Sequence, residues 1–267
     1  MFMELYIIGN GYDLSWGLKT RYQDFANFVK AKYPHEYKEI TKLFSLEYNW
    51  SDFEDRIGES FEQLEKVNSL KIKEFQTNNK VFETPPITSK IISDLLKEWI
   101  AKIMIDSKPQ PIVTKEAVIN FNYTEYLKGY FWNNVLNIHE KYNEVGVLQI
   151  GHSQSRVIED KFLKFKKEDF NNPFPDPKVQ MNQLSKFPNI ALQKLKEFIY
   201  GLKINKLIFY GFSFGKQDQD YFDIFDKDIK VIFYHYEPLE ECREMIKRVK
   251  NKFNNVTFIQ KKDRLEL

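Results

Sequence analysis

Short hydrophobic runs alternate along the chain with amphipathic stretches and polar turns. Residues 4–8 form the first run, and their β-branched and aromatic side chains are typical of a buried strand. Apolar positions spaced by three and four residues predict helices at residues 190–202, 218–225 and 239–253. Further short runs predict strands at residues 117–121, 135–138, 147–150, 206–210, 230–236 and 256–259. This alternation predicts an α/β fold, with a Rossmann-like and mainly parallel sheet that has helices on both faces.

A helical insertion is expected after the first strand. Residues 20–23 and 51–54 each have the form of a capping box and precede apolar residues at helical spacing. The first of these helices should end at Pro34, and residues 91–103 form a third with a wide apolar face. We therefore expect one domain over residues 1–267, with a helical insertion at residues 21–105.

Two later segments complete the prediction. Thr124 is expected to cap a short helix that begins at residues 126–131. Residues 152–187 carry a basic run at 161–167 and three prolines, which is loop chemistry of a length typical of a lid or flap. We expect this segment to be irregular.

The corner Gly9-Asn10-Gly11 follows the first strand directly, and a helix should begin there. Two glycines one residue apart permit a tight turn and a close approach of a ligand to the backbone. The third glycine of the dehydrogenase fingerprint is absent, and no acidic residue ends a second strand about 20 residues further on. These absences argue against an NAD-dependent dehydrogenase, while a plain strand-turn-helix corner without a ligand stays open.

Other polar corners follow other predicted strands. Because ligands bind beyond the carboxyl ends of the strands in such sheets, these corners should share one edge. The predicted pocket is lined by residues from all of them: Gly9, Asn10, Gly11, Asn122, His139, Gly211 and Ser213. Asp218 and Asp220 begin the helix after the last of these corners, where carboxylates suit the positive end of a helix dipole. They could also hold a magnesium ion, although nothing in the sequence supports a metal site.

Composition narrows the function classes. The 40 Lys and Arg residues nearly balance the 38 Asp and Glu residues, so we do not expect a nucleic-acid binder. Cys242 is the only cysteine, which excludes an intramolecular disulfide and a Cys-rich zinc site. Apolar runs of five or six residues are too short to cross a bilayer, and the amino terminus does not resemble a signal peptide. We expect a cytoplasmic protein with no membrane contact.

Several motifs resemble the abortive-infection AbiH family of bacterial anti-phage proteins. They lie at residues 7–14, 17–25, 50–54, 120–124, 137–139 and 210–222. More remotely, the order of elements is similar to the sirtuin-like superfamily, whose members bind NAD. That second resemblance implies NAD contacts at Gly9, Gly11, Asn122, Gly211 and Ser213, and catalytic roles for Asn122 and His139. Neighbouring corner residues complete the predicted binding set: Asn10, Asp13, Tyr123, Asp218 and Asp220.

The chemistry of these residues allows more than one role. The Asn122 amide can donate and accept, which suits a ribose hydroxyl or a water, although an Asx turn is an alternative. An unperturbed imidazole titrates near neutrality, so His139 could accept a proton, or it could be a core histidine bonded to a carbonyl. Asp13 would repel a diphosphate but could bind ribose hydroxyls or cap backbone N–H groups.

Two functions follow from these expectations. The preferred one is hydrolysis of NAD to nicotinamide and ADP-ribose. NAD is then the substrate, no other cofactor is expected, and a phage-derived molecule could be the trigger. The alternative is a non-catalytic module that senses NAD or a related nucleotide and controls a partner. Either function is compatible with a homo-oligomer. In sirtuin-like proteins the strand-end histidine is typically followed by glycine, whereas His139 is followed by Glu140. Many of these proteins also have aspartate at the position of Thr124. Both departures favour the alternative, and the lack of a four-cysteine zinc module argues against protein deacetylation.

Overall fold

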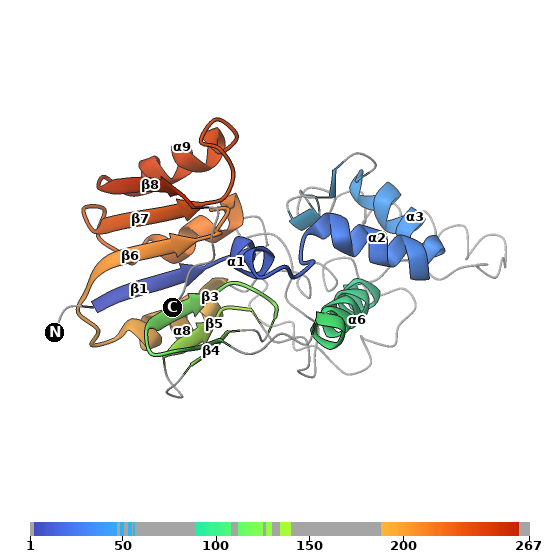
Figure 1. Cartoon of the computed structure of the whole chain (residues 1–267), viewed down its shortest axis with the longest axis horizontal. Coiled ribbons are helices and arrows are strands. Elements are labelled where there is room, and N and C mark those ends of the chain that lie inside the picture. Colours follow the sequence, from blue (N-terminus) through green and yellow to red (C-terminus); the bar gives the residue numbers. More distant parts are fainter. Residues whose placement is uncertain are drawn as a thin grey trace, which may run out of the picture. The chain divides into compact units, whose positions relative to one another are not determined.

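A computed structural model describes residues 3–46, 49–50, 53–54, 56, 89–107, 112–124, 127–129, 134–139 and 188–261 (Figure 1). The chain divides into two compact units. The first contains Met1–Arg21, Ile100–Glu144 and Phe187–Leu267, and the second contains Tyr22–Trp99 and Val145–Lys186. The predicted strand at 147–150, the flap at 152–187 and most of the helix after residue 54 lie outside the described residues.

The first unit is built on a six-stranded parallel sheet. Its strands are β1 (Met3–Ile8), β3 (Ala117–Asn120), β5 (Val135–Asn137), β6 (Ile204–Tyr210), β7 (Lys230–His235) and β8 (Val256–Gln260). Their spatial order is β5-β3-β1-β6-β7-β8, and every neighbouring pair is parallel. The chain runs outward from β1 in one direction and returns to its other side at β6. This is the order of a doubly wound fold, and it confirms the predicted Rossmann-like α/β class, with the switch point between β1 and β6.

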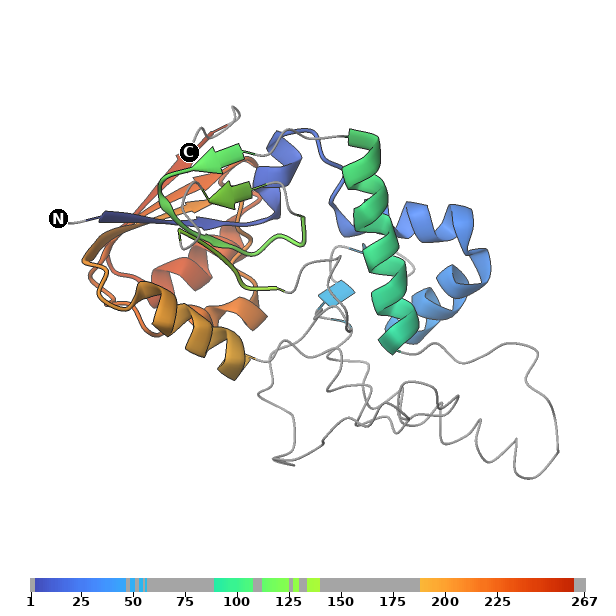
Figure 2. The same cartoon turned by 90° about the horizontal axis from the view of Figure 1, so that it is seen from below.

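Three helices pack together on one face of this sheet. They are α8 (Pro188–Ile199), the 3₁₀ helix η4 (Lys216–Phe222) and α9 (Arg243–Lys252), and the two views show them on the same side (Figure 1, Figure 2). Right-handed crossovers that move the chain in one direction across a sheet all fall on one face, which explains this grouping. The helix predicted at 218–225 is present as η4, and it begins two residues earlier.

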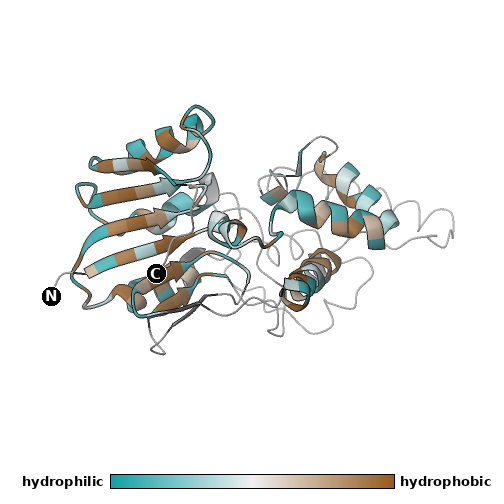
Figure 3. Ribbon diagram, viewed as in Figure 1, coloured by the Kyte–Doolittle hydropathy of each residue, from teal (hydrophilic) through white to brown (hydrophobic). Residues whose placement is uncertain are grey.

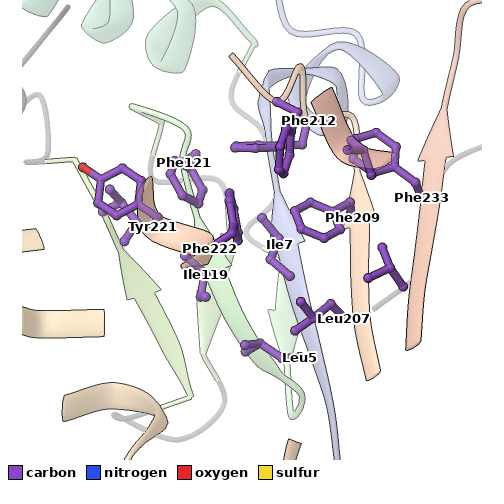
Figure 4. Packing of buried hydrophobic residues seen from close by; sticks show 14 of the residues in the cluster. Leu5, Ile7, Ile119, Phe121, Leu207, Phe209, Phe212, Tyr221, Phe222 and Phe233 are labelled. Carbon is purple, nitrogen blue, oxygen red and sulfur yellow. The ribbon is translucent and has the colours of Figure 1, made fainter. Parts of the chain in front are cut away.

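The core of the unit lies between these helices and the sheet. Strand register brings Leu5 opposite Leu207, and Ile7 opposite Phe209, so alternate residues form a continuous apolar layer. The Phe209 ring stacks on Phe233, with centroids 5.1 Å apart. Figure 3 shows how hydrophobic the strands are, and Figure 4 shows this cluster from close by. Burial of each such side chain contributes roughly 1.5–3 kcal/mol, so the layer fixes the register of the strand ends.

One predicted helix is wrong in the first unit. Residues 127–129 form the strand β4 (Leu127–Gly129), which pairs in parallel with β2 (Ile112–Thr114). A short run of apolar and aromatic residues is ambiguous between strand and helix, and the neighbouring strand decides it here. Thr124 therefore caps no helix at this position.

The second unit contains the predicted helical insertion. Its described helices are α2 (Tyr22–Lys32), α3 (Pro34–Phe44) and the part of α6 (Ser89–Ser107) up to Trp99. Phe25 of α2 packs against Trp50, Phe53 and Trp99, with ring centroids 5.2–5.9 Å apart. The sequence prediction missed α3, because Pro34 ends α2 and also occupies the first turn of the next helix, where proline needs no N–H partner.

Candidate functional site

Two glycine corners meet at the switch point of the sheet. The helix α1 (Asn10–Ser15) begins after Gly9, and Gly11 N donates to the Gly211 carbonyl oxygen at 2.8 Å. A Cβ on Gly11 would lie 2.5 Å from Gly211 Cα, and one on Gly9 would lie 2.6 Å from Gly211 O. The loops after β1 and β6 therefore contact each other through their backbones. A side chain at Gly9 or Gly11 would prevent this contact. These glycines have a packing role that the sequence did not reveal.

Asp13 is the centre of a buried polar cluster at the same edge. Its carboxylate accepts a hydrogen bond from Asn122 Nδ2 at 3.0 Å and one from Thr124 Oγ1 at 2.6 Å. The residue is only 2% exposed. Burial raises the pKa of Asp13 to about 7, although both hydrogen bonds act in the opposite direction. A carboxyl group that titrates near neutrality thus lies one turn beyond the first glycine corner.

Asn122 is held by hydrogen bonds from its backbone N–H and from its side-chain Nδ2. Its backbone N–H donates to Asn120 Oδ1 at 3.1 Å, and Asn120 Nδ2 donates to Asn137 Oδ1 at 2.9 Å. The Asx-type bond at this corner is therefore made by Asn120 and not by Asn122. Asn122 Nδ2 is committed to Asp13, while Asn122 Oδ1 is buried and accepts no hydrogen bond from the part of the chain that the structure describes. The site thus contains a buried acceptor that none of the described residues satisfies.

His139 lies beside this cluster. It follows β5, is buried, and stacks on Tyr123 with ring centroids 4.8 Å apart and an interplanar angle of 25°. Phe121 contacts the same imidazole edge-on at 6.0 Å. The corner after β3 therefore contributes both the Asn122 amide and the two rings that orient His139. Sequence reasoning placed His139 and the corner after β3 at one edge, and the stack of His139 on Tyr123 joins these two parts of the chain.

The corner after β6 is organised differently. Phe212 and Phe214 are buried in the core on either side of Ser213, which is exposed. Arg248 Nε of α9 donates to the Phe214 carbonyl oxygen at 2.7 Å and holds the loop. Residues 211–215 have the G-x-S-x-G spacing of a nucleophile elbow, but the left-handed residue is Phe214, with φ of 51°, and not the serine. The strain therefore does not fall on Ser213 as that motif requires.

The remaining predicted residues take separate positions. Asn10 is exposed and its Nδ2 donates to Thr20 O at 2.9 Å, which ties α1 to the chain that follows it. Asp218 is buried and Asp220 is exposed, both within η4. Among the residues with described placement, no group of three or more His, Cys, Asp or Glu side chains could hold a metal ion. At this edge, a hydrogen bond joins Asn122 to Asp13, and a ring stack joins Tyr123 to His139.

The sequence analysis missed three members of this arrangement. Asn120 and Asn137 are the last residues of two otherwise apolar strands, and the strand register places them opposite each other. This shared position at the strand ends could have indicated the hydrogen bond between their side-chain amides. Thr124 does not act as the predicted helix cap, because its hydroxyl donates to Asp13. No local pattern could reveal that bond, because it joins residues 111 positions apart.

The doubly wound sheet and the polar groups beyond its strand ends define an α/β protein with a polar cluster at the carboxyl edge of its sheet. The family model for bacteriophage abortive infection AbiH matches residues 5–236, so this chain belongs to the AbiH family. Its membership places it among anti-phage abortive-infection proteins. Comparisons with curated proteins and with solved structures found no match. In the described residues, no helix has the length and apolar character needed to cross a membrane.

Proposed function

We propose that this AbiH protein acts in abortive infection by hydrolysing NAD to nicotinamide and ADP-ribose. In this reaction the bond between the nicotinamide nitrogen and ribose C1′ breaks, and its electron pair goes to the nicotinamide ring. Water forms the new bond to C1′ and loses a proton. Nicotinamide leaves as a neutral molecule, so the protein has to orient the sugar and the water and to accept that proton.

The observation that best supports this proposal is the unsatisfied hydrogen-bond acceptor Oδ1 of Asn122. Its Oδ1 atom is buried without a partner among the described residues. An unsatisfied buried acceptor costs about 1–3 kcal/mol, and a ribose hydroxyl or an attacking water would recover that cost. The amide cannot rotate to satisfy itself, because Nδ2 is bonded to Asp13. Asn122 is therefore the residue that we assign to orienting the sugar or the water.

His139 is the residue that we assign to accepting the proton. Imidazole is suited to this role near neutral pH, and a positioned general base contributes typically 10²–10⁴-fold. The Tyr123 ring stacked on it limits the orientations of the imidazole. The order of glycine corner, asparagine corner, strand-end histidine and glycine-serine corner is also that of the sirtuin-like superfamily, and this resemblance supports NAD as the substrate.

A second function is favoured by the burial of His139. Only 6% of this residue is exposed, between Phe121 and Tyr123, and a general base has to be reached by the water that it deprotonates. The alternative is a module that binds NAD or a related nucleotide at the same edge without turnover and controls a partner. Calorimetric binding of NAD with no product would identify this case.

The test of the proposal uses a fluorogenic NAD analogue with purified protein, with and without phage lysate. The wild type should release the fluorescent product, and Asn122→Ala and His139→Ala should each lower the rate by at least about 100-fold. Asn254→Ala is the control, because Asn254 Nδ2 also bonds a carboxylate, Asp228, but on an exposed surface. No product from the wild type under either condition would refute the hydrolase proposal.

A further inference from the structure

Asp13 is the acidic residue in the first turn of α1, but its side chain makes no capping bond to that helix. The helix α1 has Gly9 at its N-cap and no side-chain capping bond, and Asp13 lies three residues past its first residue. Its side chain contacts the corner after β3 instead. Burial of a carboxylate is unfavourable unless hydrogen bonds compensate, so its place in the fold points to a role toward those partners.

The two oxygens of Asp13 fix the plane of its carboxylate. Thr124 Oγ1 holds Oδ2 and leaves Oδ1 for Asn122 Nδ2. Above about pH 7, where Asp13 is ionised, the opposite orientation of the Asn122 amide would place its carbonyl oxygen against a carboxylate oxygen, and neither atom would have a proton to donate. Asp13 therefore decides which atom of the Asn122 amide remains available, and that atom is the acceptor Oδ1.

We infer that Asp13 is a positioning residue: it holds the Asn122 amide with Oδ1 available, so that the site selects ligands that donate a hydrogen bond from a sugar hydroxyl. The inference rests on the proposed function only for the identity of the ligand. Phosphate oxygens of a nucleotide at neutral pH accept hydrogen bonds and cannot satisfy Oδ1. The ribose next to the scissile bond of NAD has two hydroxyls that can. ADP-ribose keeps this second ribose, whereas ADP has only the ribose that carries adenine.

The test compares the binding of ADP-ribose and ADP by calorimetry. The wild type should bind ADP-ribose more tightly than ADP, and Asp13→Ala should lose at least about tenfold of this preference, the size of one hydrogen bond. Asp13→Asn should retain the preference. Its new oxygen can accept from Asn122, and its new NH₂ can donate to the Thr124 hydroxyl, which both donates and accepts. Rescue by the isosteric variant separates positioning from loss of packing.

Asp228→Ala is the matched control, because it removes an exposed Asn–Asp bond of the same kind. Equal preference for ADP-ribose in the wild type and in Asp13→Ala would overturn the inference, as would a wild type that does not prefer ADP-ribose. If Asp13→Ala does not fold, Asp13→Asn decides: a variant that folds but loses the preference contradicts positioning. Binding without NAD cleavage would refute the hydrolase proposal alone.

Discussion

The Thr124 hydroxyl lies 2.6 Å from Oδ2 of Asp13 and donates to it, although the two residues are 111 positions apart. This bond joins the corner after β1 to the corner after β3, on neighbouring strands of the sheet. The sirtuin-like resemblance implied an aspartate where Thr124 stands. In the structure, α1 provides a carboxylate at that place.

Asp13 should make folding stability depend on pH. Its pKa is raised from 3.8 in the unfolded chain to about 7 in the fold, so the folded state retains the proton that the unfolded state has lost. Stability is therefore highest below the unfolded pKa and falls as the pH rises through about 4 to 7, by up to roughly 4 kcal/mol. Asp13→Asn removes this loss. The free energy of unfolding of Asp13→Asn minus that of the wild type should therefore increase as the pH rises. Denaturant unfolding at pH 4.5, 6.0 and 7.5 measures this difference.

The exposed carboxylate of Asp228 provides the control for this measurement. Asp228→Asn should follow the wild-type curve, because the residue is exposed. A difference between Asp13→Asn and wild type that stays constant with pH would show that the carboxyl group of Asp13 does not titrate in this range.

Thr124→Val should shift the titration of Asp13. The hydrogen bond from Thr124 lowers the pKa of Asp13, so its removal should move the midpoint upward while the side-chain volume is kept. Carboxyl NMR of Asp13 would report the midpoint directly. A midpoint that falls or stays unchanged would show that the hydroxyl does not stabilise the ionised form.

Gly11→Val should destabilise the fold, whatever its effect on ligands. The new Cβ would meet the backbone of Gly211, which cannot move as a flexible side chain can. Overpacking of this kind costs about 1–3 kcal/mol or more, which is at least several degrees in melting temperature for a chain of this size. Gly17→Ala is the comparison, because a Cβ there meets no atom within 4 Å and only its positive φ is strained. A Gly11→Val melting curve that overlays the wild type would contradict the backbone contact.

The sequence was informative where local pattern and tertiary structure agree. Buried parallel strands show as apolar runs, and polar residues just beyond them mark the carboxyl edge of the sheet, so the sheet and the placement of Asn122 and His139 could be predicted. The helix α3 was not predicted, because the same residue, Pro34, ends α2 and begins α3. The strand β4 was hidden because its pairing with β2, and not its local pattern, determines its conformation. The roles of Thr124 and Gly11 depend on contacts between distant corners, which no local pattern encodes.

We propose that the protein defends the cell by removing NAD through Asn122 and His139. The most direct measurement is the NAD content of phage-infected cells that produce the wild type, Asn122→Ala, His139→Ala or the surface control Asn254→Ala at equal levels. We predict that NAD falls after infection and that phage yield drops with the wild type and with Asn254→Ala only. Full phage protection by His139→Ala, or protection by the wild type with NAD unchanged, would contradict the account.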